Sequence, residues 1–524
     1  MAESIIISKK KLHFVFLHLD LGIGGAEQLM VNLALASTSF INTGIGTGTG
    51  RDENSSGKDY KDKDTSLNGN VSIFTTHCNQ NHCFDAVKKS CDPPGKLASS
   101  VHLVGTFLPV TIFGKGTAFC STIRMLYLSF SARRMYPDAD VIVLDVLPSP
   151  IPYLVLKSKC VIYYCHFPDK LLTRDTINGE QHNASSRNGV SIRNALKNAY
   201  RSILNRVEEW TMSYADLICV NSDFTRNEVL RAFPSLNSKH DRVKMQVLYP
   251  AIDLSKFIPP DFELKRILAK KAANCAGAHV NNEAEDAQMP IVSLNRFERK
   301  KNITVLLHAY ASILNNFQEN NKQPPAPLVI AGGYDPRNVE NVEYLKELKD
   351  LATTLGIRSH VKFRPSVSDK ERAVLLQSAI CVVYTPHREH FGIVPLEAMY
   401  AGSAVVAMRS GGPTETILDG VTGVLVDMKL GDNCDALSIA IKDLLDDPKK
   451  AIKMGERGHD HVKEKFGLEP FRKEWKRLVL DEGIPRGQRR MKDRSGLDRV
   501  ILFMTYAVIL AAWYLVRYLL AGSF

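Results

Sequence analysis

The sequence lacks the cysteine patterns that mark a metal site or a disulfide scaffold. Its 10 cysteines are spread from Cys78 to Cys434, and the closest pairs, Cys78/Cys83 and Cys160/Cys165, have no matching second half. Zinc ribbons need paired short spacings, and disulfide frameworks belong to much shorter secreted chains. We therefore expect no metal site, and we expect reduced thiols of the kind found in the cytosol.

A nucleic-acid-binding motif and a signal-peptide order are also missing. The formal net charge is +11, but the basic residues are dispersed except near the end of the chain. This excess permits anionic phosphates or a membrane surface as partners, and without a motif nucleic acid is disfavoured. The first residues place their lysines after the short apolar run "IIIS", which is the reverse of a signal peptide.

One long uncharged run stands near the other end of the chain. Val500–Val516 carries no charge, and residues 500–520 make roughly 31 Å of helix, enough to cross the hydrocarbon layer. We predict a transmembrane helix over 500–520 and a basic juxtamembrane linker over 483–499, whose charge favours the cytosolic side. An interfacial or buried terminal helix is the alternative. The basic residues before the run are Arg486, Arg489, Arg490, Lys492, Arg494 and Arg499.

The remaining chain alternates short apolar strands with helical stretches, which predicts an α/β fold of two Rossmann-like, doubly wound domains. We expect an N-terminal domain over 11–250 and a C-terminal domain over 251–482. A Gly-, Thr- and Ser-rich stretch at 43–70 is expected to be a disordered loop. Phe107–Met135 is apolar with interspersed arginines, and it fits either a bilayer surface or a buried helix of the first domain.

The stretch "EHFGIVPLEAMYAGSAVVAMRSGG" from Glu389 carries the strongest chemical signal. Pro395 suits the first turn of a helix, so Glu389 lies in the preceding loop and Glu397 about one turn inside. Main-chain amides at a helix N-terminus bind phosphate, and a glycine lets the phosphate approach. The candidate amides belong to Phe391, Gly392, Ile393 and Val394.

The two glutamates have alternative interpretations. A retaining glycosidase needs carboxyls about 5–5.5 Å apart, whereas eight residues of helix span roughly 12 Å, so we favour a division of labour. In that division Glu389 meets a reacting sugar and Glu397 meets a ribose. The structural alternative is that Glu397 caps or pairs within the fold.

Three other stretches follow predicted strands. "LGIGGAEQ" places Gly24 and Gly25 before a helix, but it lacks the acidic residue of a dinucleotide fingerprint. "LNRFERKKN" supplies Arg296 and Lys301, two cations that can neutralise a leaving diphosphate. The same stretch also fits a solvated basic turn. "LVIAGGYD" ends a strand in Gly332 and Gly333, with room for a nucleotide at the edge of the sheet.

Two histidines are candidates for the sugar side of the site. His166 ends the strand "YYCHFPD", where it can hydrogen-bond a sugar or assist proton movement, and His390 stands beside Glu389. A lone histidine is also commonly structural.

The stretch from Glu389 resembles the E-x7-E motif of retaining glycosyltransferases with the GT-B fold. The following "AMYAGSAVVAMRSGGPTETILDGVTGVLVD" continues the pattern. The resemblance implies two domains that face a cleft, with the first on the acceptor side and the second binding the donor. It also implies that Gly24 and Gly25 form the glycine loop beneath the donor diphosphate and that Arg296 and Lys301 clamp it.

The quoted stretches together resemble the dolichol-pathway mannosyltransferases of the endoplasmic reticulum over roughly residues 11 to 480. That family adds the second and third mannoses, α-1,3 and α-1,6, to the lipid-linked oligosaccharide of N-glycosylation. The resemblance implies GDP-mannose as donor, a dolichol-linked acceptor, retention of configuration and no metal or other cofactor. It also implies an endoplasmic reticulum membrane location with the catalytic domains facing the cytosol.

Other hypotheses stay open at this stage. They are a retaining transferase with another lipid acceptor such as phosphatidylinositol, a catalytically silent membrane scaffold, and a Rossmann oxidoreductase. Neighbouring mannosyltransferases stay an open question as partners.

Overall fold

The structure is a computed structural model of the chain. The residues that it describes are 12–38, 71–111, 116–156, 158–168, 170–171, 192–238, 244–254, 257, 259–275, 289–319, 326–427 and 434–493. The predicted disordered loop at 43–70 and the predicted transmembrane helix at 500–520 lie outside these residues. Within them, no helix combines the length and the apolar character needed to span a bilayer.

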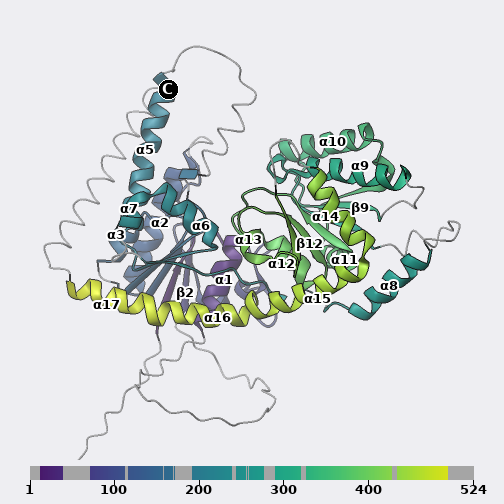
Figure 1. Cartoon of the computed structure of the whole chain (residues 1–524). Helices are drawn as coiled ribbons and strands as arrows, with labels where there is room; N and C mark the ends of the chain where they lie inside the picture. Colours follow the sequence, from purple (N-terminus) through teal and green to yellow (C-terminus); the bar gives the residue numbers. More distant parts are fainter. Residues whose placement is uncertain are drawn as a thin grey trace, which may run out of the picture. The chain divides into compact units, whose positions relative to one another are not determined.

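The chain divides into two compact units. Unit 1 comprises Met1–Val220, Glu228–Leu248 and Arg472–Phe524, and unit 2 comprises Asn221–Asn227 and Tyr249–Phe471. The division near residue 248 lies beside the expected boundary at 250. Each unit is built around one parallel sheet with helices between successive strands (Figure 1).

Unit 1 holds a seven-stranded sheet in the order β3-β2-β1-β4-β5-β6-β7. All neighbouring strands are parallel. The last strand, β7, was not among the predicted ones. The strands are β1 (Phe14–Leu17), β2 (Val71–Thr75), β3 (Val101–Leu103), β4 (Val141–Asp145), β5 (Cys160–Cys165), β6 (Leu217–Val220) and β7 (Lys244–Val247).

Helices cover both faces of this sheet, which is why strands such as "CVIYYC" read as unbroken apolar runs. On one face, Val161 and Tyr163 of β5 share a core with Met125 and Leu128. Helix α2 packs one face into the core of unit 1, as the buried-helix interpretation of Phe107–Met135 predicted, and membrane contact by its exposed residues stays a prediction. The helices of unit 1 are α1 (Gly25–Ser37), α2 (Thr117–Met135), α3 (Ile151–Leu154), α5 (Ile192–Met212), α6 (Asp223–Ala232), whose first turn belongs to unit 2, and α7 (Pro234–Ser238).

The end of the described chain completes unit 1, and this corrects two expectations. Residues 472–482, expected in the second domain, belong to unit 1, because Trp475 of α16 (Leu468–Arg477) is fully buried and its Nε1 donates to Ser37 Oγ over 2.9 Å. Residues 484–493 are not a linker but helix α17 (Ile484–Asp493), which follows the π-helical turn η7 (Leu478–Gly483).

Helix α17 packs on β5 for two physical reasons. A side chain at Gly487 would collide with the carbonyl oxygen of Lys159, so only glycine permits this close approach. Arg490 then forms a bidentate ion pair with the buried Asp216, with Nε–Oδ1 at 2.7 Å and a second nitrogen 3.0 Å from Oδ2. The basic charge that predicted a linker therefore partly serves to hold this helix.

Unit 2 holds a six-stranded parallel sheet in the order β10-β9-β8-β11-β12-β13. The sequence predicted all six of its strands, in the stretches "PIVSLNR", "PLVIAGG", "HVKFRP", "AICVVYT", "SAVVAMR" and "GVLVD". They are β8 (Ile291–Leu294), β9 (Leu328–Gly332), β10 (Val361–Pro365), β11 (Cys381–Tyr384), β12 (Ala404–Met408) and β13 (Gly423–Val426).

Alternate residues of these strands pack into two hydrophobic cores, one on each face of the sheet. Val383 and Val406 face the core formed with α9 and α14, whereas Val382 and Val405 face the core formed with α12 and α15. The helices and helical turns of unit 2 are α8 (Phe262–Cys275), η5 (Arg299–Lys301), α9 (Ile303–Glu319), α10 (Val339–Thr354), α11 (Asp369–Ser378), α12 (Ile393–Tyr400), α13 (Pro413–Thr416), α14 (Asp435–Asp446) and α15 (Pro448–Lys465).

Candidate active site

The strand order of unit 2 reverses between β8 and β11. In open α/β sheets, ligands bind outside the carboxyl ends of the strands at such a reversal. The loop after β8 carries Arg296 and Lys301, and the loop after β11 carries Glu389 and His390. The fold therefore brings the main predicted site residues of this unit to one edge of its sheet.

Lys301 and Glu389 form an ion pair at this edge. Lys301 Nζ donates to Glu389 Oε2 over 2.6 Å, and Thr385 Oγ1 donates to the main-chain oxygen of Lys301 over 2.6 Å. Burial raises the pKa of Glu389, but the charge and hydrogen bond of Lys301 outweigh it and hold the pKa below its ordinary value. Glu389 is therefore ionised at neutral pH and faces a cation.

The Gly411–Gly412 turn holds the loop that carries Glu389. The amide of Gly412 donates to the main-chain oxygen of Glu389 over 2.8 Å, and the amide of Arg388 donates to Ser410 Oγ over 2.9 Å. Gly411 has a φ of 67°, and a Cβ there would collide with the same Glu389 oxygen. Arg388 itself has a φ of 54°, a strained conformation for a residue with a side chain.

The amides predicted to bind phosphate lie at the start of α12. Gly392 is the N-cap residue with a φ of 80°, and no side chain caps the helix. Phe391 is buried, and Ile393 and Val394 open the first turn. The positive end of the helix dipole thus adjoins the Lys301–Glu389 pair along the chain.

The two remaining residues of this stretch have structural contacts. Glu397 is buried in α12 and forms an ion pair with Arg372 of α11, which is the pairing that the structural alternative predicted. The main-chain oxygen of His390 accepts a hydrogen bond from Ser222 Oγ over 2.6 Å. Glu415, which the prediction did not single out, accepts from the amides of Asp223 and Phe224 and so caps the first turn of α6.

Arg296, Gly332 and Gly333 lie together beside β8. A Cβ on Gly332, whose φ is 148°, would collide with the carbonyl oxygen of Asn295, and a Cβ on Gly333 would lie 3.3 Å from Arg296 Cγ. The Arg296 side chain is 73% exposed, and its nearest carboxylate oxygen, from Glu298, is 3.7 Å away. Such an exposed contact binds weakly, so the guanidinium can move to an anionic ligand.

In unit 1 the strand order reverses between β1 and β4. Here the structure places His166, at the end of β5, within 3.0 Å of Asp145 Oδ2, and His18, after β1, within 2.7 Å of Asp145 Oδ1. The prediction found His166 but missed Asp145 and His18. Their signal was available, because both are polar residues at the carboxyl ends of apolar strands.

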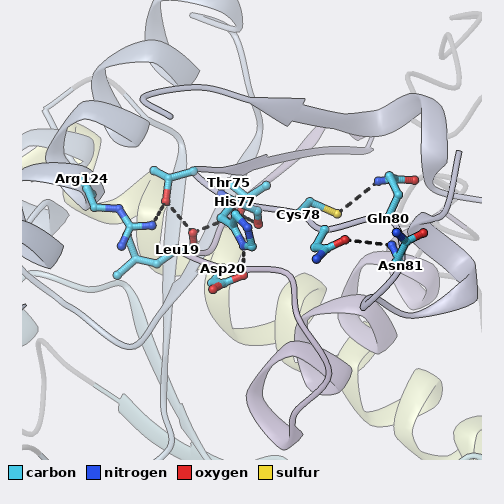
Figure 2. A network of polar contacts seen from close by, with 10 residues as sticks. Leu19, Asp20, Thr75, His77, Cys78, Gln80, Asn81 and Arg124 are labelled. Atoms are coloured by element: carbon cyan, nitrogen blue, oxygen red, sulfur yellow. Dashed lines mark hydrogen bonds and ion pairs between the residues drawn. The ribbon is translucent and has the colours of Figure 1, made fainter. Parts of the chain in front are cut away.

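The glycine loop of unit 1 follows β1, and hydroxyl groups at the end of β2 hold the start of this segment. Thr75 Oγ1 donates to the carbonyl oxygen of Leu19 (Figure 2). Thr76 Oγ1 donates to the same oxygen, and Arg124 donates to Thr76 Oγ1. An exposed pair between His77 Nδ1 and Asp20 Oδ1, 2.9 Å apart, lies alongside.

Gly24 and Gly25 themselves are not required by the local fold. Gly24 is the N-cap of α1 with an extended backbone at φ −164°. A Cβ there would meet only the flexible carboxylate of Glu27, and one on Gly25 would meet nothing within 4 Å. No cluster of three or more metal-ligating side chains occurs in the parts of the chain that the structure describes.

These features define a class, the glycosyltransferases of the GT-B fold, with two Rossmann-like units and charged residues at the strand reversals. The sequence profile of the Glycosyl transferases group 1 family matches residues 279–461. The chain is also similar in structure to sucrose-phosphate synthase from Thermosynechococcus elongatus, with a TM-score of 0.58 at 20% identity over 90% of this chain and 99% of that one.

Curated relatives identify the family. The chain is 32% identical to alpha-1,3/1,6-mannosyltransferase ALG2 of Dictyostelium discoideum, over 89% of this chain and 97% of the relative. It is 33% identical to the human protein of the same name, over 90% and 96%. The chain belongs to the alpha-1,3/1,6-mannosyltransferase ALG2 family and is a glycosyltransferase. This assignment sets aside the silent scaffold and the oxidoreductase.

Proposed function

We propose that this protein transfers mannose from GDP-mannose to a dolichol-diphosphate-linked acceptor that already carries one mannose. It adds the α-1,3 and the α-1,6 mannose with retention of configuration during assembly of the N-glycan precursor. The observation that carries the proposal is the partly buried Lys301–Glu389 pair beside the uncapped start of α12, in a chain of the ALG2 family.

The donor diphosphate is proposed to bind where unit 2 offers positive charge. Arg296, Lys301 and the amides at the start of α12 supply it, and they stabilise the charge that develops on the leaving diphosphate. These fixed cations make a metal ion unnecessary in the proposed reaction. Gly332 and Gly333, at the carboxyl end of β9 beside Arg296, are proposed to line the nucleotide. Glu397 is assigned to the ribose, and on donor binding it would give up part of its ion pair with Arg372.

The glycine loop of unit 1 supports the same donor role. Since neither Gly24 nor Gly25 is required by a positive φ or by nearby backbone, close approach of a diphosphate is the reason proposed for them.

The chemistry that we propose is a front-face substitution. The bond from the mannose anomeric carbon to the diphosphate oxygen breaks, the acceptor hydroxyl attacks the same face, and the leaving phosphate takes the hydroxyl proton. Glu389, His390 and His166 are proposed to hydrogen-bond the transferred sugar while the charge develops. Lys301 orients Glu389, and Asp145 orients His166, before the donor arrives.

A dolichol-linked acceptor stays in the bilayer, so the enzyme must work at the membrane. We propose that residues 500–520 anchor it in the endoplasmic reticulum with both units facing the cytosol. The uncharged run Val500–Val516 within it and the basic residues before it support the proposal. Exposed Phe107 and Phe130 of unit 1 are further candidates for membrane contact.

The test uses membranes that contain the protein, labelled GDP-mannose and a one-mannose dolichol-linked acceptor, with product size as the readout. Wild type is expected to extend the acceptor by two mannoses. Lys301→Met is expected to lower the rate by roughly 100-fold or more, since a group that stabilises transition-state charge is lost. Lys300→Met is the matched control, because Lys300 is an exposed neighbour that pairs with Glu298 rather than with Glu389.

Two results would count against the proposal. Labelled product on phosphatidylinositol, with none on the dolichol-linked acceptor, would assign the chain to another acceptor. Equal rates for Lys301→Met and Lys300→Met would remove Lys301 from the site.

A further inference from the structure

Three side chains of unit 1 form a hydrogen-bonded triad at the strand reversal of its sheet. His18 follows β1, Asp145 ends β4 and His166 follows β5, and β1, β4 and β5 are adjacent parallel strands. Asp145 lies in the middle: its Oδ1 is 2.7 Å from His18 Nδ1, and its Oδ2 is 3.0 Å from His166 Nε2. One carboxylate thus joins His18, which is 127 positions before Asp145, to His166, which is 21 positions after it.

The three side chains of this triad are buried to different degrees. The Asp145 side chain is fully buried and that of His18 is 3% exposed, whereas that of His166 is 28% exposed. Only His166 therefore has an appreciable surface to meet a ligand. His18 and Asp145 can act on a ligand only through His166.

The protonation of each member follows from its partners. Burial raises the pKa of Asp145, but the two histidines outweigh burial and hold it below its ordinary value, so this carboxylate is ionised and only accepts hydrogen bonds. Burial lowers the pKa of His18, but the charge of Asp145 and hydrogen bonds to Asp145 and to the main chain at Asp20 raise it overall. The raised pKa favours the protonated ring of His18, and Nδ1 donates to the ionised Asp145.

An ionised Asp145 also fixes the tautomer of His166. Because Oδ2 can only accept, Nε2 of His166 carries a proton and donates it, so Nδ1 is the ring nitrogen that can act as an acceptor. Asp145 thus accepts from His18 through Oδ1 and from His166 through Oδ2, so the position of its carboxylate is fixed from both sides.

The backbone beside Asp145 carries an independent sign of function. Val146 has a φ of 62°, in the left-handed region that is a clear outlier for a β-branched residue, and Leu147 N lies 2.6 Å from the main-chain oxygen of Asp145. Strain of this kind persists where the surrounding structure holds it, and it concentrates at active sites. Here it turns the chain sharply at the end of β4, directly after the carboxylate.

We propose that His18 and Asp145 are positioning residues of the transferase, a buried hydrogen-bonded pair that holds His166 in the orientation and tautomer in which Nδ1 accepts a hydrogen bond from the sugar. The inference rests on the role proposed above for His166. It adds two residues that the sequence pattern did not single out and assigns each a task.

The test compares two substitutions of His18 in the full-length, membrane-bound protein. His18→Asn keeps a side-chain N–H near the position of Nδ1, whereas His18→Leu removes it and leaves the buried carboxylate without that donor. We expect kcat to fall by roughly 100-fold for His18→Leu, with little change in the KM for the donor, and to recover at least tenfold in His18→Asn. A purely structural role would not give this split between kcat and KM.

The control is the other histidine–aspartate pair at the same sheet edge. His77 and Asp20 are 2.9 Å apart but more than half exposed (Figure 2). Exposed pairs contribute little, so His77→Asn is expected to leave both kinetic constants near wild type.

A second variant keeps the inference testable if His18→Leu does not fold. Asp145→Asn preserves size but offers the wrong hydrogen-bonding group to Nε2, so it favours the other tautomer of His166, and kcat is expected to fall as in His18→Leu. Wild-type kcat in a folded His18→Leu, or equal losses in His18→Leu and His18→Asn, would overturn the inference. Failure of the wild type to transfer mannose would instead refute the proposed function, since the inference is read from ratios of variant to wild-type rates.

Discussion

At the scale of single residues, two glycines of unit 2 share a backbone conformation but differ in the space that a side chain would find. Gly411 and Gly420 have nearly the same positive φ, 67° and 71°. A Cβ on Gly420 would meet nothing within 4 Å, whereas one on Gly411 would collide with the main-chain oxygen of Glu389. Comparing the two glycines therefore shows how much the contact between the Gly-Gly turn and the main chain of Glu389 contributes.

The prediction is that Gly411→Ala abolishes most of the transfer activity, while Gly420→Ala retains it. Both variants lose roughly 1–2 kcal/mol from the positive φ alone, but only Gly411→Ala must also displace Glu389. Initial rates and thermal midpoints measured on both variants check this. Equal activities in the two variants would show that the turn does not hold the carboxylate.

Residue patterns predicted part of the candidate site and missed the rest for a physical reason. Glu389, Lys301 and Gly392 were found because each belongs to a local pattern of strand, loop and helix start. His18 was missed because its partner, Asp145, is 127 residues away and reaches it only through the order of the strands. The pairing of Glu397 with Arg372 was left open for the same reason, since it depends on how α11 packs against α12.

At the scale of elements, helix α8 is held to unit 2 by a buried lysine. Lys265 donates from Nζ to the carbonyl oxygen of Gly402 over 2.6 Å and to Ser403 Oγ over 3.0 Å. Burial lowers its pKa to about 7. An ordinary lysine in an unfolded chain has a pKa near 10.4.

This difference predicts that unit 2 becomes more stable as the pH rises from about 7 towards 10. Between the two pKa values the unfolded chain binds more protons than the folded one, so the free energy of unfolding rises, by up to about 1.4 kcal/mol per pH unit. In Lys265→Met this rise should disappear. Denaturant unfolding at several pH values measures it.

Lys270, exposed on the same helix, provides the control. Lys270→Met should keep the wild-type pH dependence, and an unchanged slope in Lys265→Met would contradict the assignment.

The strands were the most predictable elements and the last helices the least. The sequences of β5 and β12 are unbroken apolar runs, which are typical of strands buried on both faces, and both strands were predicted. In α17, six of the ten residues are Arg, Lys, Asp or Gln, so composition indicated a solvated linker. Its contacts depend on two glycines, Gly483 and Gly487, and on a partner, Asp216, more than 200 residues away.

At the scale of the whole molecule, the first unit is built from both ends of the chain. Trp475 is fully buried against Ser37 of α1, and Arg490 is paired with Asp216. Removing a buried tryptophan side chain costs roughly 3–5 kcal/mol.

Two truncations follow from this arrangement. A chain that ends at Asp493 is expected to keep unit 1 folded and, if residues 500–520 are the anchor, to leave the membrane fraction. A chain that ends at Phe471 is expected to lose the cooperative unfolding of unit 1 while unit 2 survives, since only unit 1 loses packing. Limited proteolysis and fractionation compare the two. Resistance of unit 1 in the shorter chain would contradict the role of Trp475.

The position of Trp475 also bears on how this protein is made. A ribosome that has finished β7 at Val247 must still add more than two hundred residues before Trp475 and Arg490 exist. At about 5–20 residues per second, this takes on the order of 10 to 50 s. During that time the surface of α1 around Ser37 is open to chaperones, and the part of the protein begun first is the last to be finished.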